Sequence, residues 1–212
     1  MNIHRLLYQN IVWRGLFYLL NFFLNILIAR HFEAAFTGNL YYLINVFAFI
    51  TLFAGASFES ALVYFAAGKK IPSAQLFNFS LLWILFVGIL MTCFFLFFSF
   101  FTKTNIATES FSYAVIFVCG NLLITFLSSL FYADNRFIIT NAVGIVINLC
   151  LIILLFFTKQ NSLLNDQNYV SIYFISYLLQ GFIIAMIFLL TYRVKVQTKL
   201  PAISQLRSIF KF

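Results

Sequence analysis

The chain has 212 residues, of which 64% are hydrophobic and only 8% are charged, and its mean hydropathy is +1.02. A soluble domain is about half apolar and a quarter charged, so this composition excludes a soluble enzyme and a disordered chain. The 13 Lys and Arg residues outnumber the 5 Asp and Glu residues, but they lie between apolar runs rather than along one face. We therefore expect an integral membrane protein without a nucleic-acid partner, in which basic residues set the orientation.

Six apolar runs are long enough to cross a bilayer, which requires about 20 mostly apolar residues in a helix. They cover residues 11–29, 39–66, 79–101, 111–132, 137–157 and 169–192. The second run is longer than a bilayer requires and contains four small residues at 54–57, so we expect it to be tilted or bent there. Only residues 133–136 separate the fourth and fifth runs, which predicts antiparallel neighbours. The expected fold is an all-α integral membrane protein with six transmembrane helices.

The Lys and Arg residues divide unequally between the two sides of these six runs. Ten lie on the side of the N-terminus: Arg5, Arg14, Lys69, Lys70, Arg136, Arg193, Lys195, Lys199, Arg207 and Lys211. Three lie on the opposite side: Arg30, Lys103 and Lys159. Because cytoplasmic loops carry an excess of Lys and Arg, both termini are predicted to be cytoplasmic.

The composition changes after residue 192. Residues 1–192 form the predicted six-helix lobe, and residues 193–212 form a basic cytoplasmic tail that contains Pro201. Ile203, Leu206 and Phe210 recur in this tail at helical spacing with basic residues beside them. The tail is therefore either an interfacial helix or the approach to a seventh spanning helix.

Motifs for catalysis, metal binding and cofactor binding are absent from the sequence. There is no Gly-rich phosphate loop and no HExxH, and the two histidines lie at helix ends. Cys93, Cys119 and Cys150 lie inside apolar runs without the spacing of a metal site, which predicts buried free thiols. We expect a protein that is not an enzyme and that uses no cofactor or metal.

Polar side chains recur at helical spacing inside five of the six runs. These residues are Arg14, Asn21, Asn25, Asn45, Glu59, Asn121, Thr125, Ser128, Asn141, Asn148 and Gln180. Amide and hydroxyl groups of this kind stabilise contacts between membrane helices, at about 1 kcal/mol each. The alternative is that they line a water-accessible cavity that receives a polar substrate. A single Asn or Ser favours the first interpretation, whereas aligned stripes on five helices favour the second.

Two charged residues inside the runs allow alternatives of their own. Glu59 lies inside the second run, and a carboxylate at the bilayer centre costs about 2.5–3.5 kcal/mol, so it either makes a structural polar contact or acts in coupling or gating. Arg14 lies near the start of the first run. It either extends to the headgroups, with a role in topology only, or faces the cavity and attracts an anionic headgroup, because guanidinium matches phosphate geometry.

Residues 26–70, ILIARHFEAAFTGNLYYLINVFAFITLFAGASFESALVYFAAGKK, carry a family resemblance. Ala-Arg at 29–30, Gly38 before an aromatic-rich run, and Glu-Ser-Ala-Leu at 59–62 followed by Ala66 resemble the first two helices of polysaccharide-export flippases. These belong to the multidrug/oligosaccharidyl-lipid/polysaccharide exporter superfamily. Residues 131–149, FYADNRFIITNAVGIVINL, resemble the tight turn between the fourth and fifth helices of the same family. The chain departs from the family at Glu33 and Ser57, where Gly is frequent.

The resemblance implies a flippase that moves a lipid-linked oligosaccharide across the bacterial inner membrane by alternating access. Family members have two six-helix lobes, so this chain supplies one lobe and is either truncated or works with a second lobe, as a separate chain or a copy of itself. The implied partners are membrane lipid and the lipid-linked glycan. The alternatives are a drug or cation exporter of the same superfamily and a non-transporting membrane partner of a glycan-synthesis complex.

Overall fold

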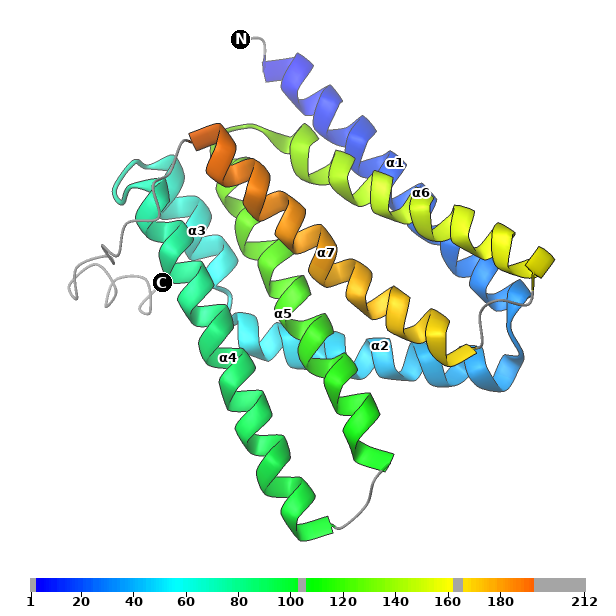
Figure 1. Ribbon diagram of the computed structural model, residues 1–212. Coiled ribbons are helices and arrows are strands. Elements are labelled where there is room, and N and C mark those ends of the chain that lie inside the picture. The colour runs from blue at the N-terminus through cyan, green and yellow to red at the C-terminus, as the bar shows by residue number, and fades with distance from the viewer. Residues whose placement is uncertain (1–2, 103–105, 162–165, 193–212) are drawn as a thin grey trace.

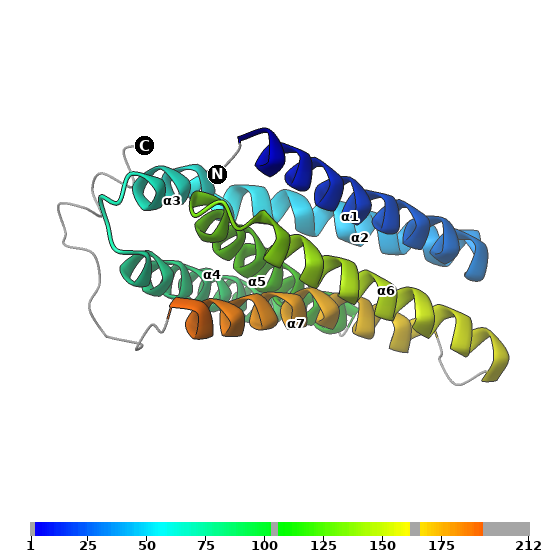
Figure 2. The same cartoon turned by 90° about the horizontal axis from the view of Figure 1, so that it is seen from above.

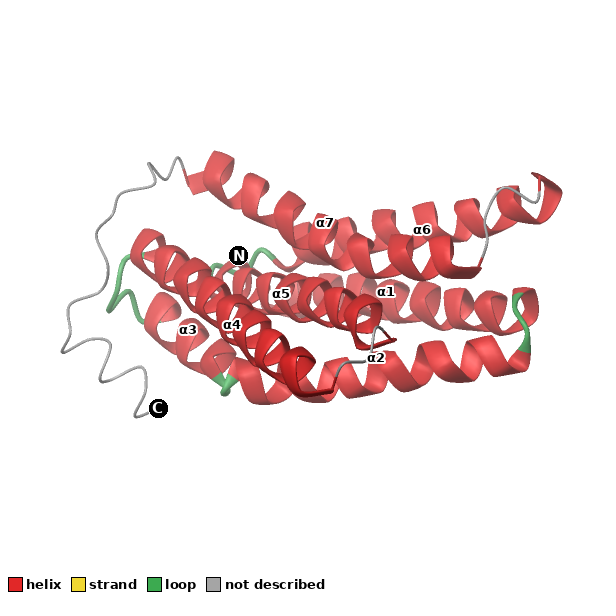
Figure 3. Cartoon of the chain, turned by 60° about the horizontal axis from the view of Figure 1, so that its bottom comes forward, coloured by secondary structure: helices red, strands yellow, loops and turns green. Residues whose placement is uncertain are grey.

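The computed structural model describes residues 3–102, 106–161 and 166–192, and the regular elements in these ranges are all α-helices (Figure 1). They are α1 Ile3–His31, α2 Ala34–Gly55, α3 Phe58–Ala67, α4 Ser73–Thr102, α5 Ile106–Ala133, α6 Phe137–Asn161 and α7 Asp166–Tyr192. Short loops join several of them (Figure 3). The predicted basic tail, with its two interpretations, lies outside the described residues.

Six of these helices are long and apolar enough to cross a membrane. The apolar stretches of α1, α2, α4, α5, α6 and α7 contain 20 to 25 residues, with mean hydropathies between 1.5 and 2.6. Only α3, with 10 residues, is too short to cross. The all-helical architecture with six long apolar helices is therefore confirmed for the described part of the chain.

The long helices alternate in direction, as successive crossings of a membrane require. The starts of α1, α4 and α6 lie at one end of the bundle, together with the ends of α3, α5 and α7 (Figure 2). This end, which we call the N-terminal end, carries Lys69, Lys70 and Arg136 in its turns. Arg30 lies in the last turn of α1, at the opposite end.

The second predicted span differs from the expectation, because the structure divides 39–66 into two helices. α2 ends at Gly55, and α3 begins at Phe58. Between them Ala56 and Ser57 take left-handed backbone conformations, with φ of 45° and 58°. This conformation is disfavoured for residues other than glycine, so contacts with neighbouring helices must hold the break in place. The predicted bend at 54–57 is confirmed as a complete interruption of the helix.

The predicted tight turn between α5 and α6 is confirmed. α5 ends at Ala133, and the backbone N–H groups of Asp134 and Arg136 both donate to the carbonyl oxygen of Phe131. Asn135 is left-handed, with φ of 58°, which suits asparagine better than most residues. This turn reverses the chain within three residues and makes α5 and α6 antiparallel neighbours.

α5 lies at the centre of the bundle. It contacts α2, α3, α4, α6 and α7, and its closest association is with α7. The two helices approach closely because glycines face the partner helix: a Cβ on Gly120 would lie 2.6 Å from the backbone nitrogen of Leu178, and one on Gly181 would lie 2.7 Å from Leu123 Cβ. Small residues at such contacts are typical of membrane helix packing.

α1 occupies a peripheral position. It packs along α6 and makes only a slight contact with α2, although a turn of two residues joins α1 to α2. Figure 1 shows the two helices diverging from this turn, with α1 following α6 and α2 crossing α5. α1 is therefore joined to the bundle mainly through α6.

Candidate functional site

The eleven predicted site residues differ widely in exposure. Four are buried, with 7–9% of their surface exposed: Ser128, Asn141, Asn148 and Gln180. Four are half-buried: Asn21, Asn25, Asn121 and Thr125. Three are exposed: Arg14, Asn45 and Glu59. The set is therefore divided between the interior of the bundle and its surface.

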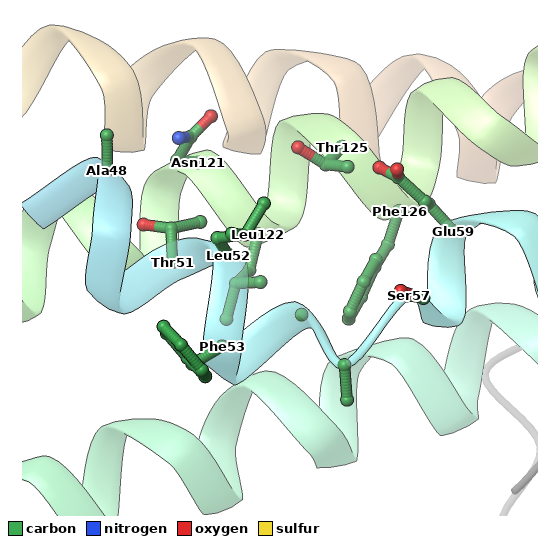
Figure 4. A pocket seen from close by; sticks show the side chains of 12 residues that line it. Ala48, Thr51, Leu52, Phe53, Ser57, Glu59, Asn121, Leu122, Thr125 and Phe126 are labelled. Carbon is green, nitrogen blue, oxygen red and sulfur yellow. The ribbon is translucent and has the colours of Figure 1, made fainter.

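Three of the eleven lie together around a cavity at the α2–α3 break, which we call the break cavity. Its volume is about 550 Å³, and its lining includes Glu59, Asn121 and Thr125. Figure 4 shows the Glu59 side chain extending from α3 toward Thr125 on α5. The lining comes from α2, α3 and α5 and encloses one partly polar space. The cavity interpretation expects the polar side chains of Glu59, Asn121 and Thr125 to share such a space.

The break itself supplies further polar groups to this cavity. Gly55, Ala56 and Ser57 all line it. The N–H of Ala56 donates to the carbonyl oxygen of Phe53 at 3.1 Å, which closes the last turn of α2. From α4, Trp83 Nε1 donates to the carbonyl oxygen of Ala54 at 2.8 Å. These two bonds satisfy two of the carbonyl groups that lack a partner at every helix C-terminus.

The break also changes the surroundings of Glu59. In a continuous helix over 39–66 this carboxylate would lie within the helix, whereas in the structure it lies in the first turn of α3. The N-terminus of a helix carries a partial positive charge that stabilises an acidic side chain, by about 0.3–1 kcal/mol when exposed. The negative charge of Glu59 therefore lies next to the partial positive charge at the start of α3.

A second polar group lies between α6 and its neighbours, away from the break cavity. Gln180 on α7 approaches Gly144 on α6, where a Cβ would lie 3.0 Å from Gln180 Nε2. Asn141 Nδ2 donates to the carbonyl oxygen of Phe137 at 2.8 Å, within its own helix. Asn148 Nδ2 is buried and has no hydrogen-bond partner among the described residues. These three residues are thus buried in the bundle, and the hydrogen bond of Asn141 lies within α6.

Arg14 lies on α1, at an exposed position. Its guanidinium carbon is 5.9 Å from the centre of the Tyr18 ring, and it hydrogen-bonds to the Tyr18 side chain. It also lies within electrostatic range of Tyr132 at the end of α5. The guanidinium is thus exposed and held by an aromatic neighbour, which is compatible with either of its two predicted roles.

A group of tyrosines between α1, α2 and α7 extends beyond the residues predicted from the sequence. Tyr41 donates to the backbone carbonyl of Asn25 at 3.0 Å, and the hydroxyls of Tyr173 and Tyr177 lie 3.2 Å apart. The hydroxyl of Tyr169 is buried without a partner in the described part of the chain. None of these four tyrosines is among the eleven predicted site residues, and Tyr169 joins the group from the start of α7.

The sequence also missed two contributors to the break cavity. Thr51 lines it from α2, and Ser57 lines it from the break. The run of small residues at 54–57 was the available indication, because it already predicted a bend. Trp83 lies in the run 79–101, which contributes none of the predicted site residues. Its hydrogen bond to the Ala54 carbonyl depends on the helix break, which exposes that carbonyl.

Comparison with known proteins finds no matching family model, no matching curated protein and no matching solved structure. The family resemblance therefore rests on the motifs at residues 26–70 and 131–149 alone.

Proposed function

We propose that the chain forms one lobe of a transporter that moves a lipid-linked oligosaccharide across the bacterial inner membrane. The observation that carries the proposal is the break cavity, a partly polar space of about 550 Å³ between helices whose outer faces are apolar. Such a space gives hydrated groups a place inside a bilayer, where they would otherwise have no polar surroundings. The motifs that resemble polysaccharide-export flippases support the same class of function.

The proposed orientation places the N-terminal end of the bundle in the cytoplasm. The excess of Lys and Arg in the turns and tail on this side supports it. Arg14 then lies toward the cytoplasmic entrance, where an anionic diphosphate headgroup of the substrate would arrive. A second lobe, as a separate chain or another copy, would complete the substrate path beside the separated α1 and α2.

Export of the glycan in a complementation assay tests the role of Arg14. Arg14→Ala should abolish export, because the guanidinium is lost, whereas Arg14→Lys should retain part of it, because the positive charge remains. Arg136→Ala is the matched control: Arg136 lies in the α5–α6 turn at the same end, over the Tyr192 ring, and its loss should leave export intact. Wild-type export by Arg14→Ala at equal protein levels would assign Arg14 a role in topology only.

A drug or cation exporter is the second candidate, and the position of Glu59 in the break cavity favours it. Cationic compounds require a counter-charge inside the membrane, and this carboxylate supplies one. Resistance to cationic compounds, with no effect on glycan export, would support the exporter and contradict the flippase. The converse result would support the flippase.

A further inference from the structure

A smaller pocket lies between α1 and α6, at the end of the bundle opposite to the N-terminal end, where both helices end (Figure 1). We call it the end pocket. Its volume is about 210 Å³, and it is lined by Leu27, Arg30 and His31 of α1 and by Leu155 and Phe156 of α6. A water molecule occupies about 30 Å³ in the liquid, so the space exceeds a single bound water severalfold. It shares no lining residue with the break cavity.

Two apolar spans end at this pocket. The span of α1 ends at His31 and that of α6 at Phe156, and the sequence is polar at 158–161. Leu27 lies about one helical turn before His31, toward the interior of the span. The end of a spanning stretch marks the boundary between the hydrocarbon core and the headgroups. We therefore expect the charged residues at the depth of the lipid phosphates and the apolar ones beside the start of the acyl chains.

The polar part of the lining is entirely basic. Arg30 and His31 supply it, and no Asp or Glu lines the pocket in the described part of the chain. Arg30 is exposed, and its side chain forms no ion pair with a described residue, not even with Glu33 in the adjoining turn. The His31 ring packs edge-on against Phe32, with ring centres 4.8 Å apart, and imidazole carries an N–H donor in either charge state. The pocket thus offers two donors and no acid to bind them.

Basic residues at a helix end have a simpler role, which is to offset the partial negative charge of the helix C-terminus. That role requires no space beside them and no contribution from another helix. Here the space has a second wall on α6, formed by Leu155 and by Phe156, which is 60% exposed. Free phosphate would use only the basic part of this pocket. A phospholipid carries a phosphate for the basic part and an acyl chain for the apolar part.

Basic pockets between transmembrane helices bind anionic lipid headgroups in other membrane proteins, and guanidinium forms paired, charge-assisted hydrogen bonds to phosphate oxygens. We propose that the end pocket binds an anionic phospholipid, with the phosphate on Arg30 and His31 and an acyl chain along Leu27 and Phe156. The charge of the lining selects the lipid, because a zwitterionic headgroup would bring a second cation to Arg30. In the orientation proposed above, the lipid belongs to the leaflet opposite to the cytoplasm.

The bound lipid also holds α1 against α6. Only 11% of the α1 span is buried, and α1 joins the bundle mainly through α6. A lipid that touches Arg30 on one helix and Phe156 on the other adds to this contact. Hydrogen exchange in the last turn of α1 should therefore slow when the lipid binds, and Arg30→Gln should prevent the slowing.

Thermal unfolding of the purified full chain in detergent tests the site, with phosphatidylglycerol against phosphatidylcholine of the same acyl chains. A ligand that binds only the folded state raises the melting temperature. At about tenfold above its dissociation constant, phosphatidylglycerol should give a rise of about 3–6 °C over phosphatidylcholine. Arg30→Gln should remove most of this difference, whereas Arg30→Lys should keep part of it, because the charge remains. Phe156→Ala should reduce it, because part of the apolar wall is lost.

Two matched controls should keep the full difference between the lipids. Arg136→Gln removes an exposed arginine from the α5–α6 turn at the opposite end of the bundle. Phe22→Ala removes an exposed phenylalanine from α1, outside the pocket. Equal melting temperatures in the two lipids for the unsubstituted chain would overturn the proposal, and so would a difference that Arg30→Gln retains.

Glycerol 3-phosphate at the same concentration separates a lipid site from a site for a free anion. It should give no rise, because it lacks the acyl chain. A rise equal to that of phosphatidylglycerol would show that the pocket takes a phosphate alone, and it would reject the lipid. These measurements contain no glycan and no transport step, so their failure would leave the proposed transport function standing, and a failure of glycan export would leave the lipid site standing.

Discussion

α5 and α1 are both long apolar helices, yet the structure uses them in opposite ways. Within their candidate spans, 67% of α5 is buried against other helices but only 11% of α1, although their mean hydropathies are 2.2 and 1.7. None of the large exposed hydrophobic residues lies on α5 between 110 and 133, whereas α1 presents several, such as Leu19 and Phe22. Hydropathy thus identifies a span, but it does not distinguish a central helix from a peripheral one.

α5 is more buried than α1 because its Gly120 lies against a neighbouring helix, whereas Gly15 of α1 does not. At Gly120 the backbone of α7 is so close that a side chain has no room, whereas nothing lies within 4 Å of a Cβ on Gly15 of α1. Lipid is as apolar as leucine, so close packing rather than the hydrophobic effect holds membrane helices together. The three glycine substitutions below test this comparison, from the largest expected effect to the smallest.

Gly120→Ala should be the most destabilising of the three. The new Cβ would lie between 2.6 and 2.9 Å from three backbone atoms of α7, and backbone cannot rotate away as a side chain can. Overpacking of this kind costs typically 1–3 kcal/mol, and we expect about 3 kcal/mol here. Reversible unfolding in mixed micelles measures the change, and a loss below about 0.5 kcal/mol would contradict the close α5–α7 contact.

Gly144→Ala should have an intermediate and local effect. Its Cβ would meet the Phe17 ring of α1 at 2.6 Å and the Gln180 side chain at 3.0 Å, and both side chains can move. We expect a loss of about 1 kcal/mol, expressed as loosening of α1. Hydrogen exchange should quicken in α1, whereas protection of α5 and α7 should stay unchanged; an equal change in α5 would show that α1 is not a separate peripheral element.

Gly15→Ala should have the smallest effect, in the opposite direction. The position lies within α1 with open space around it, so alanine adds no clash and removes backbone freedom from the unfolded chain. Alanine is favoured over glycine inside helices by roughly 0.5–1 kcal/mol. The same unfolding measurement should show a small gain, and a loss above 1 kcal/mol would indicate that another element covers this face of α1.

Much of the fold was predictable because it depends on local sequence. The six long apolar helices follow from run length and hydropathy, and the α5–α6 turn follows from the four residues between two runs. The bend at 54–57 was predicted from its small residues. Its form was not: Ala56 and Ser57 adopt left-handed conformations that their own sequence disfavours, so packing of α3 and α4 against the break determines it.

The site was less predictable, because helical spacing assigns a residue to a face without identifying what that face meets. Asn121 and Asn141 both belong to polar stripes. In the structure Asn121 lines the break cavity, whereas Asn141 bonds to a carbonyl of its own helix. Glu59 was assigned to mid-helix, and its place at the start of α3 depends on the break. Neither difference can be obtained without the positions of the neighbouring helices.

The central claim is that a water-accessible polar cavity lies at the α2–α3 break, within a bundle whose outer faces are apolar. Labelling of Asn121→Cys with a membrane-impermeant thiol reagent tests it most directly, in a background where Cys93, Cys119 and Cys150 are replaced by Ser. Phe86→Cys is the control, because Phe86 is exposed on α4 and lies outside the break cavity. We predict rapid labelling of Asn121→Cys and none of Phe86→Cys. Equal protection of both cysteines would contradict the cavity.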